Sequence, residues 1–133
     1  MTIILPDPEP EQPVNLAELR IQRRLTTSFI KTAPVVLVLI PRERVKKPSG
    51  GFGWEDLPAR VPQLMRLIEP GAIPRPILTV DGVQREVEFE LLGEYDALIG
   101  KYDTFELDGF HWEIIGLGHS NGWEQRALVA KVG

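Results

Sequence analysis

The sequence of 133 residues contains no cysteine and only two histidines. The absence of cysteine excludes disulfide bonds and thiolate metal sites, and it fits a reducing compartment or assembly inside a cell. The longest apolar run, Val35 to Ile40, is far shorter than the roughly 20 residues that a membrane-spanning helix needs. The N-terminus has no basic start followed by an apolar run, so we expect no signal peptide and no membrane partner.

The net charge of −4 is unevenly distributed along the chain. Residues 1–75 carry 11 Lys and Arg against 8 Asp and Glu, a net charge of +3. Residues 76–133 carry 4 against 11, a net charge of −7. A basic half and an acidic half give a polarised field, which suits stacking of copies or contact with a polyanion, although ordinary solvated faces produce the same distribution.

Three turn signals punctuate the C-terminal half, at Asp81-Gly82, Asp108-Gly109 and Asn121-Gly122. These dipeptides tolerate the positive φ angles that two-residue hairpin turns require, and each lies between runs typical of strands. The pattern predicts a mainly β fold over residues 34–133, a small antiparallel β-barrel of six to seven strands. The expected strands cover residues 35–40, 60–68, 77–80, 83–91, 102–107, 110–115 and 123–132.

The clearest alternation of apolar and polar residues lies in the expected strand 83–91. One face of this strand would enter the core, and the other would present Glu86, Glu88 and Glu90. Because no histidine or third ligand accompanies them, a metal site is disfavoured. We expect a solvated acidic face, or one that lines a channel and repels phosphates.

An acidic, proline-rich arm occupies residues 1–14, with prolines at Pro6, Pro8, Pro10 and Pro13. Proline removes amide donors and favours extended backbone, so this arm cannot be a helix or a central strand. We expect it to be disordered or to lie along a partner, where it would contact a neighbouring subunit.

A helix is expected over residues 15–33, because Asn15 and Glu18 form a pattern typical of a capping box. Its apolar residues fall on two sides of the helix. This predicts a helix that is contacted on both sides, or a break near Thr26-Thr27. The two apolar sets are Leu16, Leu19 and Ile30 on one side, and Ile21, Leu25 and Phe29 on the other.

A basic, glycine-rich segment over residues 41–54 predicts a long flexible loop between two strands. Such a long loop is uncommon in a compact domain unless it has a role. Its cations can contact nucleic-acid phosphates, and Phe52 or Trp54 can stack on a base; a mobile surface loop is the alternative. The candidate contact residues are Arg42, Arg44, Lys46, Lys47, Gly50, Gly51 and Phe52.

No sequence motif indicates catalysis. His111 lies in an expected strand and points away from the core, and His119 lies in a loop without a nucleophile motif. Gly116, Gly118 and Gly122 follow an expected strand, as the glycines of a dinucleotide-binding motif do. Only eleven residues follow Gly122, too few for the helix and further strand that such a fold needs. We therefore expect no enzyme, no cofactor and no metal site, with a small hydrolase using His119 as a minor alternative.

Several segments resemble the head-to-tail stopper, or head-completion, proteins of long-tailed bacteriophages, especially those of actinobacterial hosts. The resemblance covers most of residues 25–133 and leaves out the arm. The matching segments are FIKTAPVVLVL (29–39), GGFGW (50–54), VPQLMRLIEP (61–70), LTVDGVQREVEFELL (78–92), YDTFELDGFHW (102–112) and NGWEQRA (121–127).

The resemblance implies a non-enzymatic virion protein at the head–tail interface, assembled in the host cytoplasm. It implies a homo-oligomeric, six-fold ring between an adaptor on the portal side and a tail terminator. This ring would close the filled head around the channel for double-stranded DNA and dock the tail. The loop 41–54 would match the channel-plugging loop of that family. An adaptor, a tail terminator and a small nucleic-acid-binding barrel remain as alternatives.

Overall fold

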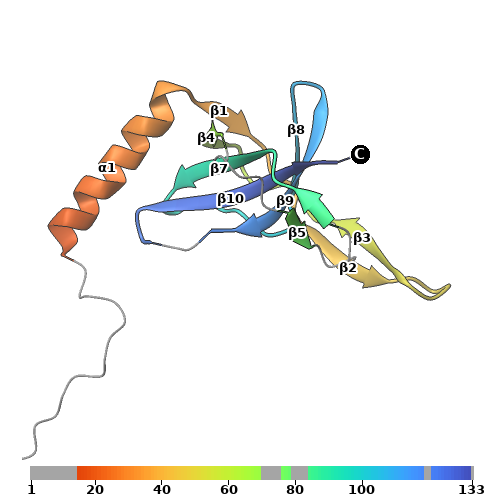
Figure 1. Cartoon of the computed structure of the whole chain (residues 1–133). Helices are drawn as coiled ribbons and strands as arrows, with labels where there is room; N and C mark the ends of the chain where they lie inside the picture. Colours follow the sequence, from red (N-terminus) through yellow and green to blue (C-terminus); the bar gives the residue numbers. More distant parts are fainter. Residues whose placement is uncertain (1–14, 70–75, 79–83, 119–120, 133) are drawn as a thin grey trace, which may run out of the picture.

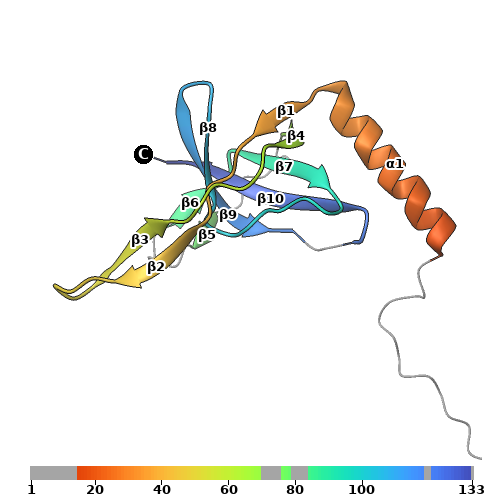
Figure 2. The ribbon, with the colours of Figure 1, turned by 180° about the vertical axis from the view of Figure 1, so that it is seen from behind.

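The computed structural model describes residues 15–69, 76–78, 84–118 and 121–132. It confirms a mainly β fold: six antiparallel strands form a nearly closed barrel with one N-terminal helix (Figure 1). Two further two-stranded ribbons accompany the barrel. The helix and one of these ribbons, β2–β3, lie at opposite ends of the molecule, and Figure 2 shows the same arrangement from behind.

The helix α1 spans Leu16–Thr32 without interruption, so the break considered near Thr26-Thr27 is absent. The Asn15 side chain caps it by accepting hydrogen bonds from the amides of Ala17 and Glu18, at 2.9 and 3.4 Å. One side of α1 faces the barrel and buries Thr26 and Ile30. Within the described chain, the opposite side has no covering element.

The barrel strands follow the order β1-β4-β7-β10-β9-β8, all antiparallel. Their bounds are β1 Val35–Leu37, β4 Gln63–Ile68, β7 Phe89–Glu94, β10 Glu124–Lys131, β9 Phe110–Leu117 and β8 Thr104–Leu107. The ribbons are β2 Arg42–Lys46 with β3 Phe52–Asp56, and β5 Pro76–Leu78 with β6 Gln84–Glu86.

Backbone bonds between the two edges of the sheet close the barrel. The Ile40 amide donates to the Thr104 carbonyl at 2.8 Å, and the Thr104 amide donates back at 2.9 Å. This pairing protects two edges that would otherwise be exposed. The enclosed core is aliphatic with one aromatic ring, and its buried members are Leu37, Leu39, Met65, Leu91, Phe105, Ile114, Ala127 and Val129.

The Asp108-Gly109 turn joins β8 to β9 as predicted, with φ angles of 53° and 79°. The Asn121 side chain accepts hydrogen bonds from the amides of Trp123 and Glu124, both at 3.0 Å, and Gly122 has a φ of 88°. This second turn leads into β10. The third predicted turn, Asp81-Gly82, lies outside the described residues.

The continuous strand expected over 83–91 is wrong, because the chain changes partner in its middle. β6 pairs with β5, whereas β7 pairs with β4 and β10. Between them Val87 is buried and packs near Ile115 and Ala130, and the Glu88 amide donates to the Val129 carbonyl at 2.8 Å. The sequence alternates through both strands, so it does not reveal this exchange.

The flexible loop expected over 41–54 is also wrong on both flanks, where β2 and β3 pair as a hairpin. The strands Arg42–Lys46 and Phe52–Asp56 pair with each other along their whole length, although few of their side chains are apolar. Arginine side chains lie on the aromatic rings instead, as the next subsection describes. Only the connection between the strands is irregular.

Candidate functional site

The hairpin β2–β3 projects from the barrel at the end opposite α1 (Figure 1). Five cross-strand pairs, from Arg42–Asp56 to Lys46–Phe52, hold its strands together. Its turn is closed by the Lys47 amide, which donates to the Gly51 carbonyl at 3.0 Å. Gly50 and Gly51 have φ angles of 88° and 79° with no atom near the Cβ position, so these glycines serve the turn conformation.

One face of the hairpin is basic and aromatic. Residues directly opposite in an antiparallel pair share a face, so alternate positions gather there. The Arg44 guanidinium lies 4.4 Å from the centroid of the Phe52 ring, and that of Arg42 lies 4.7 Å from the Trp54 ring. These cation–π contacts hold long side chains in place. We call this the cationic face. Its members are Arg42, Arg44, Lys46, Phe52 and Trp54, together with Asp56, which lies opposite Arg42 at the end near the barrel.

The opposite face of the hairpin is acidic near the barrel. Glu43 and Glu55 are cross-strand partners there, followed by Val45 opposite Gly53. The Lys47 side chain lies over Gly53, where an added Cβ would be 2.5 Å from Lys47 Cε. This face therefore carries two carboxylates near the barrel and a lysine near the turn.

The root of the hairpin is fixed by a buried carboxylate. Both Arg42 and Arg85 donate hydrogen bonds to Glu113 on β9, which is only 8% exposed. Arg42 Nε also donates to the Tyr102 carbonyl at 2.8 Å, and the rings of Trp54 and Tyr102 are 4.9 Å apart. The hairpin is thus attached to the barrel through charge-assisted bonds and an aromatic pair.

This geometry divides the predicted basic residues into two groups. Arg42 is neutralised at the root by Glu113. Arg44, Lys46 and Lys47 are exposed, and no carboxylate of the described chain lies within ion-pair distance of them. Phe52 is 58% exposed beside them. We call Arg44, Lys46, Lys47 and Phe52 the cationic tip; this combination can contact phosphates and stack on a base.

Sequence reasoning did not find the residues that fix the root: Glu113, Arg85 and Tyr102. The arginine partners of Glu113 lie 28 and 71 residues away, so no local motif contains them. The only signal was a single glutamate within the apolar run of β9. Tyr102 has a φ of 74°, which is uncommon for a bulky residue and is not readable from composition.

The three predicted acidic residues have different surroundings. Glu86 and Glu88 are exposed. Glu90 is partly buried, and Arg126 Nη1 lies 3.2 Å from its carboxylate. Arg126 also donates to Glu124 at 2.8 Å, and this hydrogen bond raises the pKa of the Arg126 guanidinium. The exposed negative charge of this group is therefore carried by Glu86 and Glu88.

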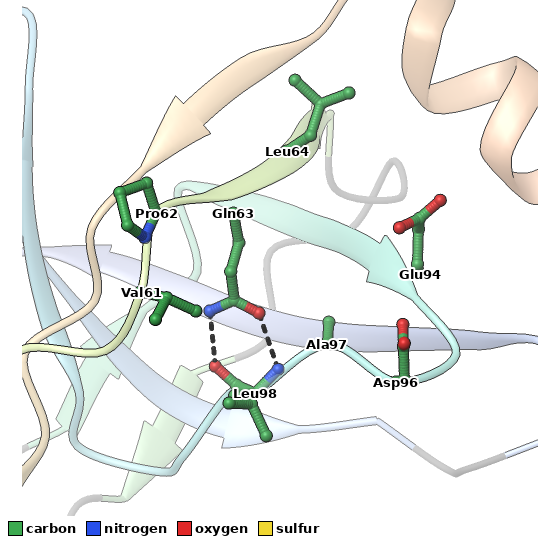
Figure 3. A pocket seen from close by; sticks show the side chains of 8 residues that line it. All are labelled: Val61, Pro62, Gln63, Leu64, Glu94, Asp96, Ala97 and Leu98. Atoms are coloured by element: carbon green, nitrogen blue, oxygen red, sulfur yellow. Dashed lines mark hydrogen bonds between the residues drawn. The ribbon is translucent and has the colours of Figure 1, made fainter.

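A shallow groove of about 290 Å³ lies beside the start of β4 (Figure 3). The Gln63 amide donates to the Leu98 carbonyl at 2.9 Å and accepts from the Leu98 amide at 2.7 Å, which joins the two walls. Glu94 accepts a hydrogen bond from Thr27 of α1 at 2.8 Å. The lining brings together no nucleophile with a base; it consists of Val61, Pro62, Gln63, Leu64, Glu94, Asp96, Ala97 and Leu98.

The two histidines do not build a site in the described structure. The His111 side chain is exposed, as predicted, and its Nδ1 lies 3.4 Å from Glu106. His119 lies outside the described residues, as do Pro6, Pro8, Pro10 and Pro13. Among the residues that the structure describes, no three His, Cys, Asp or Glu side chains gather as metal ligands would. The described part of the chain also contains no helix with the length and apolarity to cross a membrane.

Comparisons with known proteins give a likeness in structure and none in sequence. No model of a protein family and no curated protein matches the sequence. The structure is similar to a chain of a solved assembly described as "Virion of native gene transfer agent (GTA) particle", with a TM-score of 0.47 and 15% sequence identity. The likeness covers 74% of this chain and 94% of that chain. A likeness of this degree does not assign a function.

Proposed function

We propose that this chain is a structural subunit of a phage head–tail connector, a stopper that forms a six-fold ring, closes the DNA-filled head and docks the tail. The sequence resemblance to stopper proteins supports this proposal. The barrel with a protruding element between residues 41 and 54 agrees with the fold that this resemblance implies. An adaptor or a tail terminator of the same connector is the nearest alternative.

The observation that carries the proposal is a projecting hairpin with a fixed root and a cationic tip. A plug must resist the packaged DNA, and the buried Glu113 with its two arginines provides a firm attachment. At the other end, Arg44, Lys46 and Lys47 would contact phosphates at the DNA end. Phe52 would contact a base or the hairpin of a neighbouring subunit.

The remaining surfaces would serve assembly and passage of DNA. A channel wall should not hold DNA, and the exposed Glu86 and Glu88 would repel phosphates there. A ring subunit needs two different surfaces for its two neighbours, in addition to surfaces for the adaptor and the tail terminator. The proposed role is structural and non-enzymatic, and its location is the head–tail interface of the virion.

The test uses filled heads that carry portal and adaptor, completed with the purified chain. The variant Arg44→Gln/Lys46→Gln/Lys47→Gln removes the cationic tip, and Glu43→Gln/Glu55→Gln on the opposite face of the same hairpin is the matched control. We expect the wild-type chain and the control to protect the packaged DNA from nuclease, and the tip variant to lose protection several-fold. Failure of the wild-type chain to join the heads, or equal protection by all three, would contradict the proposal.

A second candidate function is a small nucleic-acid-binding barrel, which the Arg44–Phe52 stacking favours. The isolated chain would then bind short single strands without any connector partner. With three phosphates neutralised by the tip, the logarithm of the binding constant would fall with that of salt concentration with a slope of about −2. Absence of such binding leaves the connector as the better account.

A further inference from the structure

The outer side of α1 carries an apolar stripe that the barrel does not cover. Ile21, Leu25 and Phe29 follow one another at intervals of four and are 55%, 57% and 45% exposed. The barrel contacts the other side of the helix, where Arg23 lies 3.7 Å from the centroid of the Tyr95 ring and Thr27 bonds to Glu94. Figure 1 shows this outer side facing away from the strands.

A row of cations runs along the same exposed side. Arg20 and Arg24 each precede a member of the stripe by one position, and Lys31 lies two turns beyond Arg24; all three are exposed. Arg66 of β4 lies at the Phe29 end of the apolar stripe, with its guanidinium 3.8 Å from the centroid of the Phe29 ring. We call these six helix residues the outer helix face: Arg20, Ile21, Arg24, Leu25, Phe29 and Lys31.

We propose that the outer helix face binds residues 1–14 of a second copy of this chain. The arm has the complementary composition: Ile3, Ile4 and Leu5, four prolines, three carboxylates and no Lys or Arg. In polyproline conformation, the span from Asp7 to Glu11 is about 12 Å. The cations from Arg20 to Lys31 span about 16 Å of helix. The carboxylates can therefore follow the cation row while proline rings and aliphatic side chains cover the stripe.

The position of the arm favours a neighbouring copy over its own helix. Pro13 lies two residues before the cap Asn15, and its fixed φ restricts the reversal that an arm folding back on its own helix would need. Extended, residues 6–14 reach about 28 Å, enough to meet another subunit. The proposal rests on the proposed ring, because an arm that binds the next subunit is a head-to-tail contact of the kind that closes rings.

The absence of native cysteine allows a direct test by disulfide cross-linking of the full chain. One variant carries Ile4→Cys in the arm, and another carries Ser28→Cys, between the stripe and the cation row. Mixed and oxidised, they should give roughly tenfold more covalent heterodimer than Ile4→Cys mixed with Glu106→Cys, because binding raises the effective thiol concentration to the millimolar range. Glu106 is exposed on β8, away from α1.

Further variants test whether the outer helix face binds the arm, and whether that arm belongs to a second copy or to the same chain. Adding Ile21→Ser/Leu25→Ser to the Ser28→Cys chain should remove the heterodimer, whereas Leu117→Ser, at an equally exposed apolar residue of β9, should leave it. A heterodimer no more abundant than in the control mixture overturns the proposal, as does a monomeric disulfide in the Ile4→Cys/Ser28→Cys chain. If the chain completes filled heads but gives no heterodimer above the control, the proposed arm contact is wrong and the proposed ring stands. If it neither completes filled heads nor gives the heterodimer, the proposed ring is wrong as well.

Discussion

The hairpin β2–β3 and the helix α1 extend from opposite ends of one barrel, and they are attached in different ways (Figure 2). The hairpin is held by a nearly buried carboxylate with two arginines. The helix is held by exposed or half-buried contacts, such as Thr27 with Glu94 and Arg23 with the Gly122 carbonyl, around the buried Ile30.

The difference indicates which element is rigid and which can adjust. Separating a buried ion pair is costly, because each charge is left without its partner in a poorly solvated place. We therefore expect the hairpin to move with the barrel as one rigid unit. An element with few buried contacts opens at lower free energy, so α1 should be able to shift when a neighbour binds. A rigid plug and an adjustable docking helix suit the two roles proposed above.

The largest effect should follow removal of Glu113. Glu113→Ala leaves Arg42 and Arg85 without their shared carboxylate, and we expect the free energy of unfolding to fall by about 3–5 kcal/mol. Chemical denaturation measures this change. Glu106→Ala, whose side chain is 74% exposed, is the control and should change stability by less than about 0.5 kcal/mol. Equal values for the two variants would show that Glu113 holds the hairpin no more firmly than an exposed carboxylate would.

A second substitution tests the segment that leads from β1 into the hairpin. Leu39→Ala empties a fully buried position, and we expect a loss of about 2–5 kcal/mol. Its neighbour Val38 is 44% exposed, so Val38→Ala should cost less than about 1 kcal/mol. Thermal unfolding of both variants checks that Leu39 is buried and Val38 is exposed. Equal losses would show that Val38 is covered in solution, and the burial pattern described here would be wrong.

The turn at Gly109 gives a smaller effect. Its φ of 79° disfavours any side chain, so Gly109→Ala should cost about 1–2 kcal/mol. Asp108→Asn keeps a residue that tolerates its own φ of 53°, and its stability should stay close to wild type. Urea titrations of the two proteins provide the comparison, and a neutral Gly109→Ala would mean that the turn has another conformation.

The smallest effect concerns the helix. Thr27→Val removes the hydrogen bond to Glu94 with little change of shape, and we expect a loss of about 1 kcal/mol. Hydrogen exchange should become faster in α1 while the barrel amides keep their protection. If the barrel amides exchanged faster too, α1 and the barrel would open as one unit.

The sequence predicted the parts of the fold that depend on local chemistry. Asp108-Gly109 specified its hairpin, Asn15 specified the helix start, and the alternating residues specified strands. The exchange of partners around Val87 could not be read, because both halves alternate with the same period. The hairpin β2–β3 was missed because its strands are stabilised by arginines on aromatic rings instead of by apolar pairs.

For the candidate site, the sequence predicted which residue types take part but not how they are arranged. The cluster of Arg44, Lys46 and Lys47 was visible in the sequence as a basic segment. That Arg42 belongs to the root, and that Glu113 holds it, depends on contacts across 71 residues that only the folded chain creates. The exposure of the stripe Ile21, Leu25 and Phe29 likewise became clear only when one side of α1 was placed on the barrel.

The most direct test of the connector is a cryomicroscopy reconstruction of the chain bound to portal and adaptor. The proposed function predicts a closed ring in which the tips of all β2–β3 hairpins converge on the axis, with Lys46 and Lys47 facing the DNA end. A ring whose hairpins point outward, or a complex that contains a single copy of the chain, would contradict it.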